Sequence, residues 1–117
     1  MHELSLVAAL FETLEEKARE HGACRITMVR LRVGQLAGAV PDLLESAFET
    51  YKKGTIADGA RLEIEEVPVR VRCRDCGSDR LDVEGTFSCL SCGGRNVELV
   101  EGREIVVERL ELETEDP

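Results

Sequence analysis

Apolar residues recur every three or four positions at the start of the chain. The segment from Leu4 to His21 has this period, which is typical of an amphipathic helix, and Gly22 stands where a left-handed residue would end it. From Arg25 to Val33 the period changes to two, as in a half-buried β-strand. The chain therefore begins with a helix and a strand. Their predicted buried positions are Leu4, Val7, Ala8, Phe11, Leu14 and Ala18 in the helix and Thr27, Val29, Leu31 and Val33 in the strand.

A second helix follows a short loop. Pro41 suits the first position of a helix, where a missing amide hydrogen costs nothing. The helical pattern continues to about Lys53, and Gly54 ends it. The stripe predicted to face the core consists of Leu44, Ala47, Phe48 and Tyr51.

Two further segments alternate as strands do. The segment from Arg61 to Arg72 alternates in two phases, and we expect one strand that a bulge or bend near Glu65-Glu66 re-phases. The segment from Glu104 to Leu112 alternates again, and its predicted inward side carries Val106, Leu110 and Leu112. The pattern as a whole predicts an α+β fold in which two helices pack on a three-stranded sheet.

Between the last two strands, four cysteines form two Cys-x-x-Cys-Gly turns. They are Cys73, Cys76, Cys89 and Cys92. Two such turns facing each other present four thiolates at the corners of a tetrahedron, which is the arrangement of a structural zinc site. A rubredoxin-like iron site is the chemical alternative. Because four sulfurs close the coordination sphere, we expect the ion to hold the fold and not to catalyse a reaction.

This cysteine block reads as an insertion into another domain. We predict a zinc-ribbon domain at residues 73–97, inside an α+β domain made of residues 1–72 plus 98–117. A metal suits so short a module, because a very small hydrophobic core rarely folds alone.

The first three residues offer a second set of metal ligands. In Met1-His2-Glu3 the terminal amine, the amide nitrogen of residue 2 and the His2 imidazole can chelate one ion through fused rings. A planar, nitrogen-rich set suits Ni(II) or Cu(II). The fourth position is left open among the Glu3 amide, the Glu3 carboxylate and a partner. Taken alone, this signal is weak, because a histidine at position 2 is more often part of a solvated terminus than of a metal site.

The net charge and the start of the chain argue against several classes of protein. The net charge is −9, and no segment is basic, which argues against binding to nucleic acid or to an anionic membrane. The start of the chain has no signal-peptide pattern, and no apolar run approaches a membrane span. A cytoplasmic location follows, where paired thiols are more often metal ligands than disulfides. We interpret Cys24 as a small buried hydrophobe and His21 as a cation at the end of the first helix.

Four motifs together resemble the HypA family of nickel metallochaperones. They are the start Met1-His2-Glu3-Leu4-Ser5-Leu6, the segment Val29-Arg-Leu-Arg-Val-Gly34 running on to Val40-Pro41, the run Phe48-Glu-x-x-x-x-Gly54-Thr55 with Asp58-Gly59-Ala60, and the four-cysteine block. The resemblance implies exchangeable nickel on Met1, His2 and Glu3, and structural zinc on Cys73, Cys76, Cys89 and Cys92. It also implies two partners, an accessory nickel GTPase and the precursor of the hydrogenase large subunit.

Two other classes of function compete with this one. A zinc-ribbon interaction module of the transcription or translation machinery would show a basic face with exposed aromatic residues. Residues 73–97 have more acidic than basic side chains, and Phe87 is their only aromatic residue. An enzyme would need a nucleophile with its base or a phosphate-binding loop, and neither remains once the cysteines bind zinc. The sequence predicts a carrier that is not an enzyme, and it leaves open whether that carrier is a monomer or a homodimer.

Overall fold

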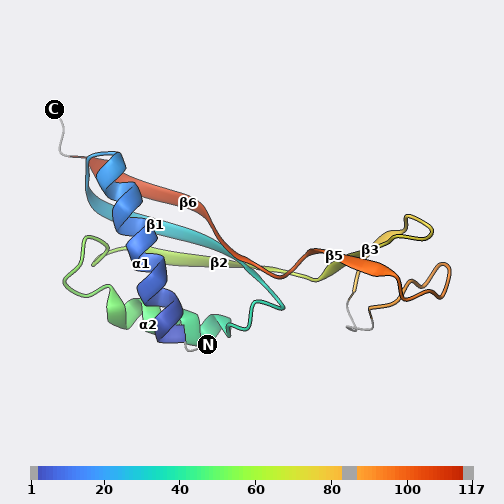
Figure 1. Ribbon diagram of the computed structural model, residues 1–117. Helices are drawn as coiled ribbons and strands as arrows, with labels where there is room; N and C mark the ends of the chain where they lie inside the picture. Colours follow the sequence, from blue (N-terminus) through green and yellow to red (C-terminus); the bar gives the residue numbers. More distant parts are fainter. Residues whose placement is uncertain (1–2, 83–86, 115–117) are drawn as a thin grey trace.

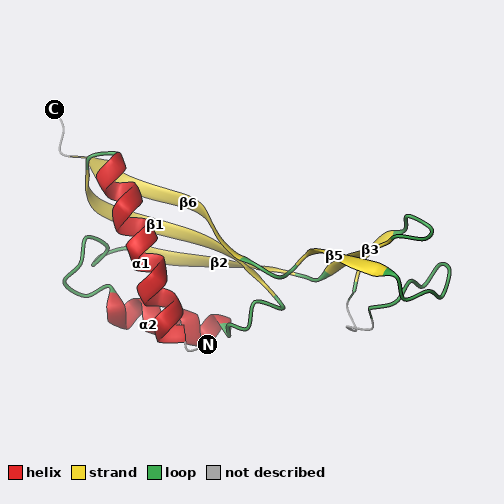
Figure 2. Ribbon diagram, in the orientation of Figure 1, coloured by secondary structure: helices red, strands yellow, loops and turns green. Residues whose placement is uncertain are grey.

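The computed structural model describes residues 3–82 and 87–114 (Figure 1). The order of elements is α1 (Glu3–Glu20), β1 (Ala23–Gly34), α2 (Pro41–Tyr51), β2 (Arg61–Val67), β3 (Arg70–Cys73), β4 (Asp79–Leu81), β5 (Val97–Glu101) and β6 (Ile105–Thr114). The molecule is elongated, with extents of 59 × 29 × 17 Å. Both helices lie on one three-stranded sheet, and a second small sheet forms the far end (Figure 2). The α+β class with an inserted four-cysteine domain is confirmed.

The helix α1 forms where the apolar period predicts it and ends as expected. Gly22 has a φ of 64°, the left-handed conformation that closes a helix with little strain in glycine. His21 lies at this end, and its Nδ1 is 2.9 Å from the carbonyl oxygen of Lys17. The stripe that α1 buries consists of Val7, Phe11, Leu14 and Ala18. The prediction that Leu4 is buried was wrong, because this residue of the first turn is 55% exposed.

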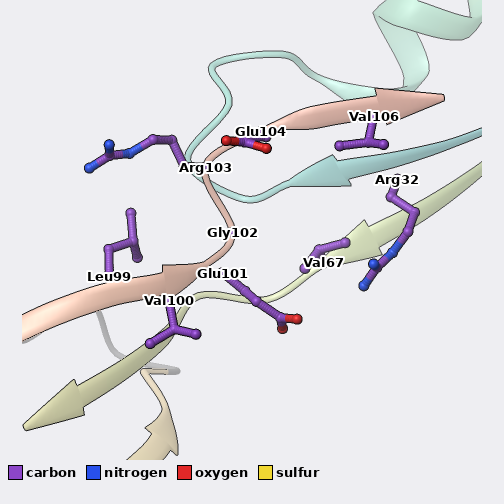
Figure 3. Close-up of a pocket in the computed structure, with 9 residues that line it drawn as sticks. All are labelled: Arg32, Val67, Leu99, Val100, Glu101, Gly102, Arg103, Glu104 and Val106. Carbon is purple, nitrogen blue, oxygen red and sulfur yellow. The ribbon is translucent and has the colours of Figure 1, made fainter. Parts of the chain in front are cut away.

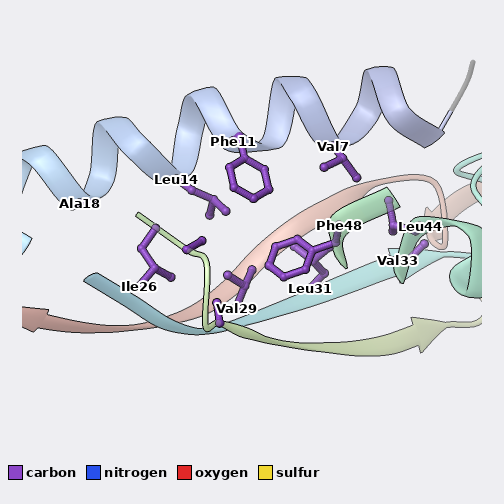
Figure 4. Close-up of a cluster of buried hydrophobic side chains, with 12 residues drawn as sticks. Val7, Phe11, Leu14, Ala18, Ile26, Val29, Leu31, Val33, Leu44 and Phe48 are labelled. Atoms are coloured by element: carbon purple, nitrogen blue, oxygen red, sulfur yellow. The ribbon is translucent and has the colours of Figure 1, made fainter. Parts of the chain in front are cut away.

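The hydrophobic core lies between the two helices and the first sheet (Figure 4). The helix α2 contributes Leu44 and Phe48, and the rings of Phe11 and Phe48 are 5.5 Å apart between centroids. Tyr51 packs on Phe11 at 4.7 Å, although its own side chain remains partly exposed. The predicted stripe of α2 is therefore confirmed at Leu44 and Phe48, while Tyr51 belongs to its border.

The first sheet has the order β2-β1-β6, with β1 parallel to β2 and antiparallel to β6. Two register shifts against β6 change the predicted alternation. One leaves Thr27 as an extra residue of β1, so Ile26 and not Thr27 enters the core. The other leaves Glu108 as an extra residue of β6, so Val107 packs on the core and Val106 is 45% exposed. The inward assignments of Thr27 and Val106 were wrong, because a bulge inverts the faces beyond it.

Cys24 also differs from its prediction. It lies in β1 between Ala23 and Arg25, at another register shift against β6, and its side chain is exposed. A residue at a bulge turns out of the regular alternation, so its sequence neighbours do not reveal its burial.

The segment from Arg61 to Arg72 forms two strands and not one. The break falls at Pro68-Val69, not at Glu65-Glu66, and β3 joins a second sheet of order β4-β3-β5. Proline has no amide hydrogen for a ladder, so the chain changes sheets there. This second sheet includes residues on both sides of 73–97. The division into domains stays a prediction.

The two sheets meet at a crossing of three backbone segments. Gly34 N donates to Glu104 O at 2.9 Å, and Leu36 N donates to Gly102 O at 2.7 Å. Gln35 contacts the connection between β2 and β3. Its backbone amide donates to Val67 O (3.0 Å), and its side-chain oxygen accepts a hydrogen bond from the Val69 amide (3.0 Å). The loop after β1 therefore forms hydrogen bonds with both segments that connect the first sheet to the second.

Charged side chains cover part of the first sheet. Arg30, on the central strand, donates to Glu63 (3.2 Å) and Glu65 (3.1 Å) on β2 and to Glu108 (2.7 Å) on β6. These contacts raise the pKa of Arg30, with the hydrogen bond to Glu108 as the largest cause. The Arg30 side chain thus ties the three strands together.

Candidate metal centre

The four cysteines come together at the end of the second sheet. Their Sγ atoms all lie within 4.8 Å of one another. Cys73 Sγ is 3.6 Å from Cys92 Sγ, and Cys76 Sγ is 3.4 Å from Cys89 Sγ. In a regular tetrahedron with Zn–S bonds of about 2.3 Å, the sulfurs are about 3.8 Å apart. The donor set therefore fits a tetrahedral metal that prefers thiolates, such as zinc.

The two cysteine turns are built alike. In the first, Gly77 N donates to Cys73 O at 2.9 Å, and Cys73 N donates to Ser78 O at 2.7 Å. The second repeats both hydrogen bonds between Cys89 and Gly93-Gly94, at 2.8 Å each. The glycines that follow the two turns have φ values of 79° and 75°, which a residue with a Cβ adopts only with strain. The Cys-x-x-Cys-Gly spacing thus produces two matching half-sites.

Hydrogen bonds to sulfur separate the pKa values of the thiols. The amide of Cys92 donates to Cys89 Sγ at 3.5 Å and is the largest cause that lowers the pKa of Cys89 to about 6. Ser78, through its side chain and its amide, lowers the pKa of Cys76. The pKa of Cys92 is raised to about 12: the Gly94 amide opposes the rise, but the neighbouring thiols of Cys73 and Cys89 outweigh it. Thiols that share one small volume cannot all be charged without a cation, so metal binding displaces protons from this cluster.

A buried carboxylate braces the segment before Cys89, and the sequence reading missed it. Asp82 is only 2% exposed, and its Oδ2 accepts a hydrogen bond from the Phe87 amide at 3.0 Å. Arg80 lies 3.4 Å from Asp82 Oδ1 and also donates to the carbonyl oxygen of Ser88. In the sequence, Asp82 is one of several acidic residues in the module. Only the folded chain shows that it is the buried one.

The predicted nickel ligands are only partly visible. Met1 and His2 lie outside the described residues, and Glu3 begins α1. Glu3 Oε2 accepts a hydrogen bond from the Val40 amide at 3.3 Å. Val40 is the residue that precedes the first turn of α2, so the carboxylate connects the amino ends of the two helices. This contact between residues 37 positions apart carries no signal in the sequence.

A cavity of about 240 Å³ lies at the crossing of the two sheets (Figure 3). Apolar side chains from both sheets line it, with Arg32 and Arg103 and two glutamates at its border. It contains no cysteine or histidine, so it offers no set of ligands that a nickel or zinc ion prefers. The cysteine cluster is therefore the metal centre that the described residues assemble.

Comparison with known proteins identifies the family. Residues 1–112 match the sequence model of the family described as "Hydrogenase/urease nickel incorporation, metallochaperone, hypA". The chain belongs to the HypA family. The hydrogenase maturation factor HypA of Moorella thermoacetica is 42% identical, over 97% of this chain and 100% of that relative. The HypA of Desulfitobacterium hafniense is 37% identical, over 97% of this chain and 99% of the relative.

A solved HypA structure has the same fold. The solution structure of the Ni metallochaperone HypA from Helicobacter pylori matches with a TM-score of 0.74 and 30% identity, over 98% of this chain and 100% of that chain. These matches confirm the HypA resemblance that the sequence motifs indicated, together with the fold class. HypA proteins are metallochaperones of nickel incorporation, so the carrier class of function is supported over an enzyme. Neither helix in residues 3–82 and 87–114 is long and apolar enough to cross a membrane.

Proposed function

We propose that this chain is a nickel metallochaperone that binds Ni(II) through Met1, His2 and Glu3 and delivers it for assembly of the hydrogenase metal centre. The observation that supports this most is the HypA match, which begins at residue 1 and so includes the chelating terminus. The similar Helicobacter pylori protein is itself described as a Ni metallochaperone. Nickel is the cargo in this proposal, and its site must exchange the ion.

The terminal chelate suits such exchange. The terminal amine, a backbone amide nitrogen and the His2 imidazole supply three nitrogens in one plane, which Ni(II) accepts. A fourth ligand comes from the Glu3 amide, the Glu3 carboxylate or a partner. Ligation through Oε2 would compete with the hydrogen bond that this oxygen accepts from the Val40 amide. An open or exchangeable fourth position lets an incoming ligand replace the existing ones step by step.

The zinc site has the opposite character in this proposal. Cys73, Cys76, Cys89 and Cys92 hold one structural zinc ion and leave no position for water or a substrate. The ion would join the two cysteine half-sites and so stabilise the fold of the module. The zinc-ribbon domain at 73–97 thus serves the nickel-binding domain of 1–72 plus 98–117 as a stable attachment.

The proposed partners follow from the same role. A maturation factor works with the hydrogenase maturation machinery, and we assign it an accessory nickel GTPase and the precursor of the hydrogenase large subunit. The proposed location is the cytoplasm, and the proposed oligomeric state is a monomer or a homodimer. No step of the function requires catalysis by this chain.

A free amino terminus tests the nickel site. Metal must displace protons from the α-amine, whose reference pKa is about 7.7–8.0, and from the imidazole, near 6.5. Nickel affinity should therefore fall as the pH drops through about 7 and 6. A protein extended by a few residues before Met1 has an amide in place of the amine and should lose tight nickel binding.

The assay is calorimetric titration of nickel into the free and the extended protein, with the visible absorption of square-planar Ni(II) as a second readout. The variant His2→Ala should also lose tight nickel binding while it keeps one zinc per chain, because a terminal residue contributes little to stability. His21→Ala is the matched control and should bind nickel normally. Equal nickel affinity in the free and the extended protein contradicts the terminal chelate.

A further inference from the structure

The four cysteines of the metal centre differ in their access to solvent. Cys73 and Cys89 are only 2% and 3% exposed, whereas Cys76 and Cys92 are exposed. Each Cys-x-x-Cys-Gly turn thus contributes one buried and one exposed thiol. A metal held by all four would have two sulfur ligands that small solutes can reach and two that they cannot. A dissolved oxidant therefore meets the exposed thiols first.

Each exposed sulfur lies close to a buried sulfur of the other turn. Cys76 Sγ is 3.4 Å from Cys89 Sγ, and Cys92 Sγ is 3.6 Å from Cys73 Sγ. A disulfide bond is about 2.0 Å long, so each pair needs a further approach of about 1.5 Å. An exposed thiol that is oxidised consequently has a second thiol within reach that can react with it.

Contacts that do not involve sulfur also hold the two turns side by side. The Ser78 hydroxyl donates to the Ser91 hydroxyl at 3.0 Å. Arg74 N donates to Asn96 O at 2.8 Å, and the Asn96 side chain donates to Asp75 Oδ1 at 3.2 Å. The amide–carbonyl hydrogen bonds that shape each turn are likewise independent of the sulfur atoms. A disulfide between the turns can therefore close while both turns keep their backbone contacts.

We propose that the cysteine centre is a reversible oxidation site, at which hydrogen peroxide converts the four thiolates into two disulfides between the turns, Cys76–Cys89 and Cys73–Cys92. This inference rests on the proposed zinc site and adds a chemical response to it. The pairing differs from the one that the sequence spacing suggests, because the two cysteines of one Cys-x-x-Cys motif pair with each other in thioredoxin-like redox proteins.

The oxidation of each pair balances in two steps. The exposed thiolate attacks one oxygen of hydrogen peroxide, the O–O bond breaks, and a sulfenic acid and a hydroxide ion form. The buried thiolate of the other turn then attacks the sulfenic sulfur, which forms the S–S bond and releases a second hydroxide ion. Two molecules of peroxide thus accept the four electrons that the four thiolates lose. The chain then has no thiolate left to hold a zinc ion, which is set free as Zn²⁺.

The proposed pairing determines what happens to the ribbon after oxidation. Disulfides between the turns join the same two half-sites that the metal joins, so the module loses its ion and keeps a covalent link in its place. Disulfides within the turns would leave the half-sites without such a link. A dithiol reductant restores the four thiols by exchange, and the site can then bind zinc again.

The test is release of zinc from the zinc-loaded chain after addition of hydrogen peroxide, measured with a chromogenic zinc chelator. We expect release of one zinc per chain, and return of the zinc to the protein after treatment with dithiothreitol. Cys24→Ser is the control for a thiol outside the centre and should release zinc at the wild-type rate, because Cys24 is exposed but does not belong to the cluster. Full retention of zinc in peroxide overturns the inference.

The pairing is determined by mass spectrometry of tryptic peptides, after the remaining free thiols are blocked with iodoacetamide. Trypsin cleaves after arginine, which places Cys73 and Cys76 in separate peptides and Cys89 together with Cys92 in a third. Disulfides between the turns join all three peptides, whereas disulfides within the turns join only the first two. Disulfides within the turns, or sulfinic and sulfonic acids without any disulfide, overturn the inference.

The variant Cys76→His distinguishes the two ways of pairing across the turns. Histidine supplies a fourth zinc ligand but removes the exposed thiol of the first turn. Cys73 should then pair with Cys92 and leave Cys89 as a free thiol that iodoacetamide blocks, and a Cys73–Cys89 disulfide contradicts the proposed pairing. If this variant binds no zinc, the wild-type peptide map decides alone. Failure of the zinc site itself is distinguishable, because it appears as absence of zinc before peroxide is added.

Discussion

The crossing of the two sheets leaves no room for a side chain at Gly34. A Cβ placed there would lie 2.3 Å from both the carbonyl carbon and the carbonyl oxygen of Gly102, and 2.7 Å from Arg103 N. These are backbone atoms, so no rotamer change relieves the contact. Gly34→Ala must therefore push the two backbones apart, and we predict a large loss of stability.

The size of this loss follows from the contacts. Overpacking of this kind costs about 1–3 kcal/mol. Separation of the backbones also weakens the hydrogen bonds from Gly34 N to Glu104 O (2.9 Å) and from Leu36 N to Gly102 O (2.7 Å). Each such bond contributes about 1 kcal/mol. The sum is about 3–5 kcal/mol, a large share of the roughly 5–15 kcal/mol by which a typical domain is stable.

The assay is urea denaturation of the zinc-loaded protein, followed by circular dichroism. Gly59→Ala is the matched control, because a Cβ at Gly59 meets nothing within 4 Å. That control should be neutral or stabilising by about 0.4–1 kcal/mol, since alanine reduces the freedom of the unfolded chain. If the free energies of unfolding of Gly34→Ala and Gly59→Ala differ by less than about 1 kcal/mol, the backbones at the crossing are not in tight contact.

Three further predictions concern the metal centre and the charged face. Cys89→Ser should lose stoichiometric zinc, as metal analysis would show, while the helical circular dichroism of the first domain persists; loss of all helical signal would contradict the inserted arrangement. Arg30→Ala should lower the Tm, more at low than at high salt, because its three ion pairs are partly exposed. The control Arg25→Ala removes one exposed pair and should change the Tm little. Equal changes of Tm in the two variants would show that Arg30 does not hold the three strands together. Asp82→Asn should destabilise the zinc-loaded ribbon by about 1–3 kcal/mol in thermal melts, because it weakens a buried, charge-assisted contact. Asp75→Asn, on the surface, should not. If the two variants melt alike, Asp82 does not stabilise the segment before Cys89.

The helices and the cysteine turns could be predicted from the sequence, because they depend on residues that are neighbours along the chain. The helical period fixed α1 and α2, the glycine after the first helix fixed its end, and Pro41 fixed the start of the second. The spacing of Cys73, Cys76, Cys89 and Cys92 determined the metal cluster, because each Cys-x-x-Cys-Gly turn folds by its own short-range hydrogen bonds. Such features need no knowledge of the rest of the molecule.

The faces to which strand residues turn, and the contacts between distant groups, depend instead on how the segments pack in three dimensions. The bulges at Thr27 and Glu108 belong to the pairing of β1 with β6, and each moves the residues beyond it to the other face of the sheet. The burial of Asp82, and the contact of Glu3 with the Val40 amide, join segments that only the folded chain brings together. Local periodicity does not predict such contacts, because their energy depends on how segments pack against each other, and those segments can lie far apart along the chain.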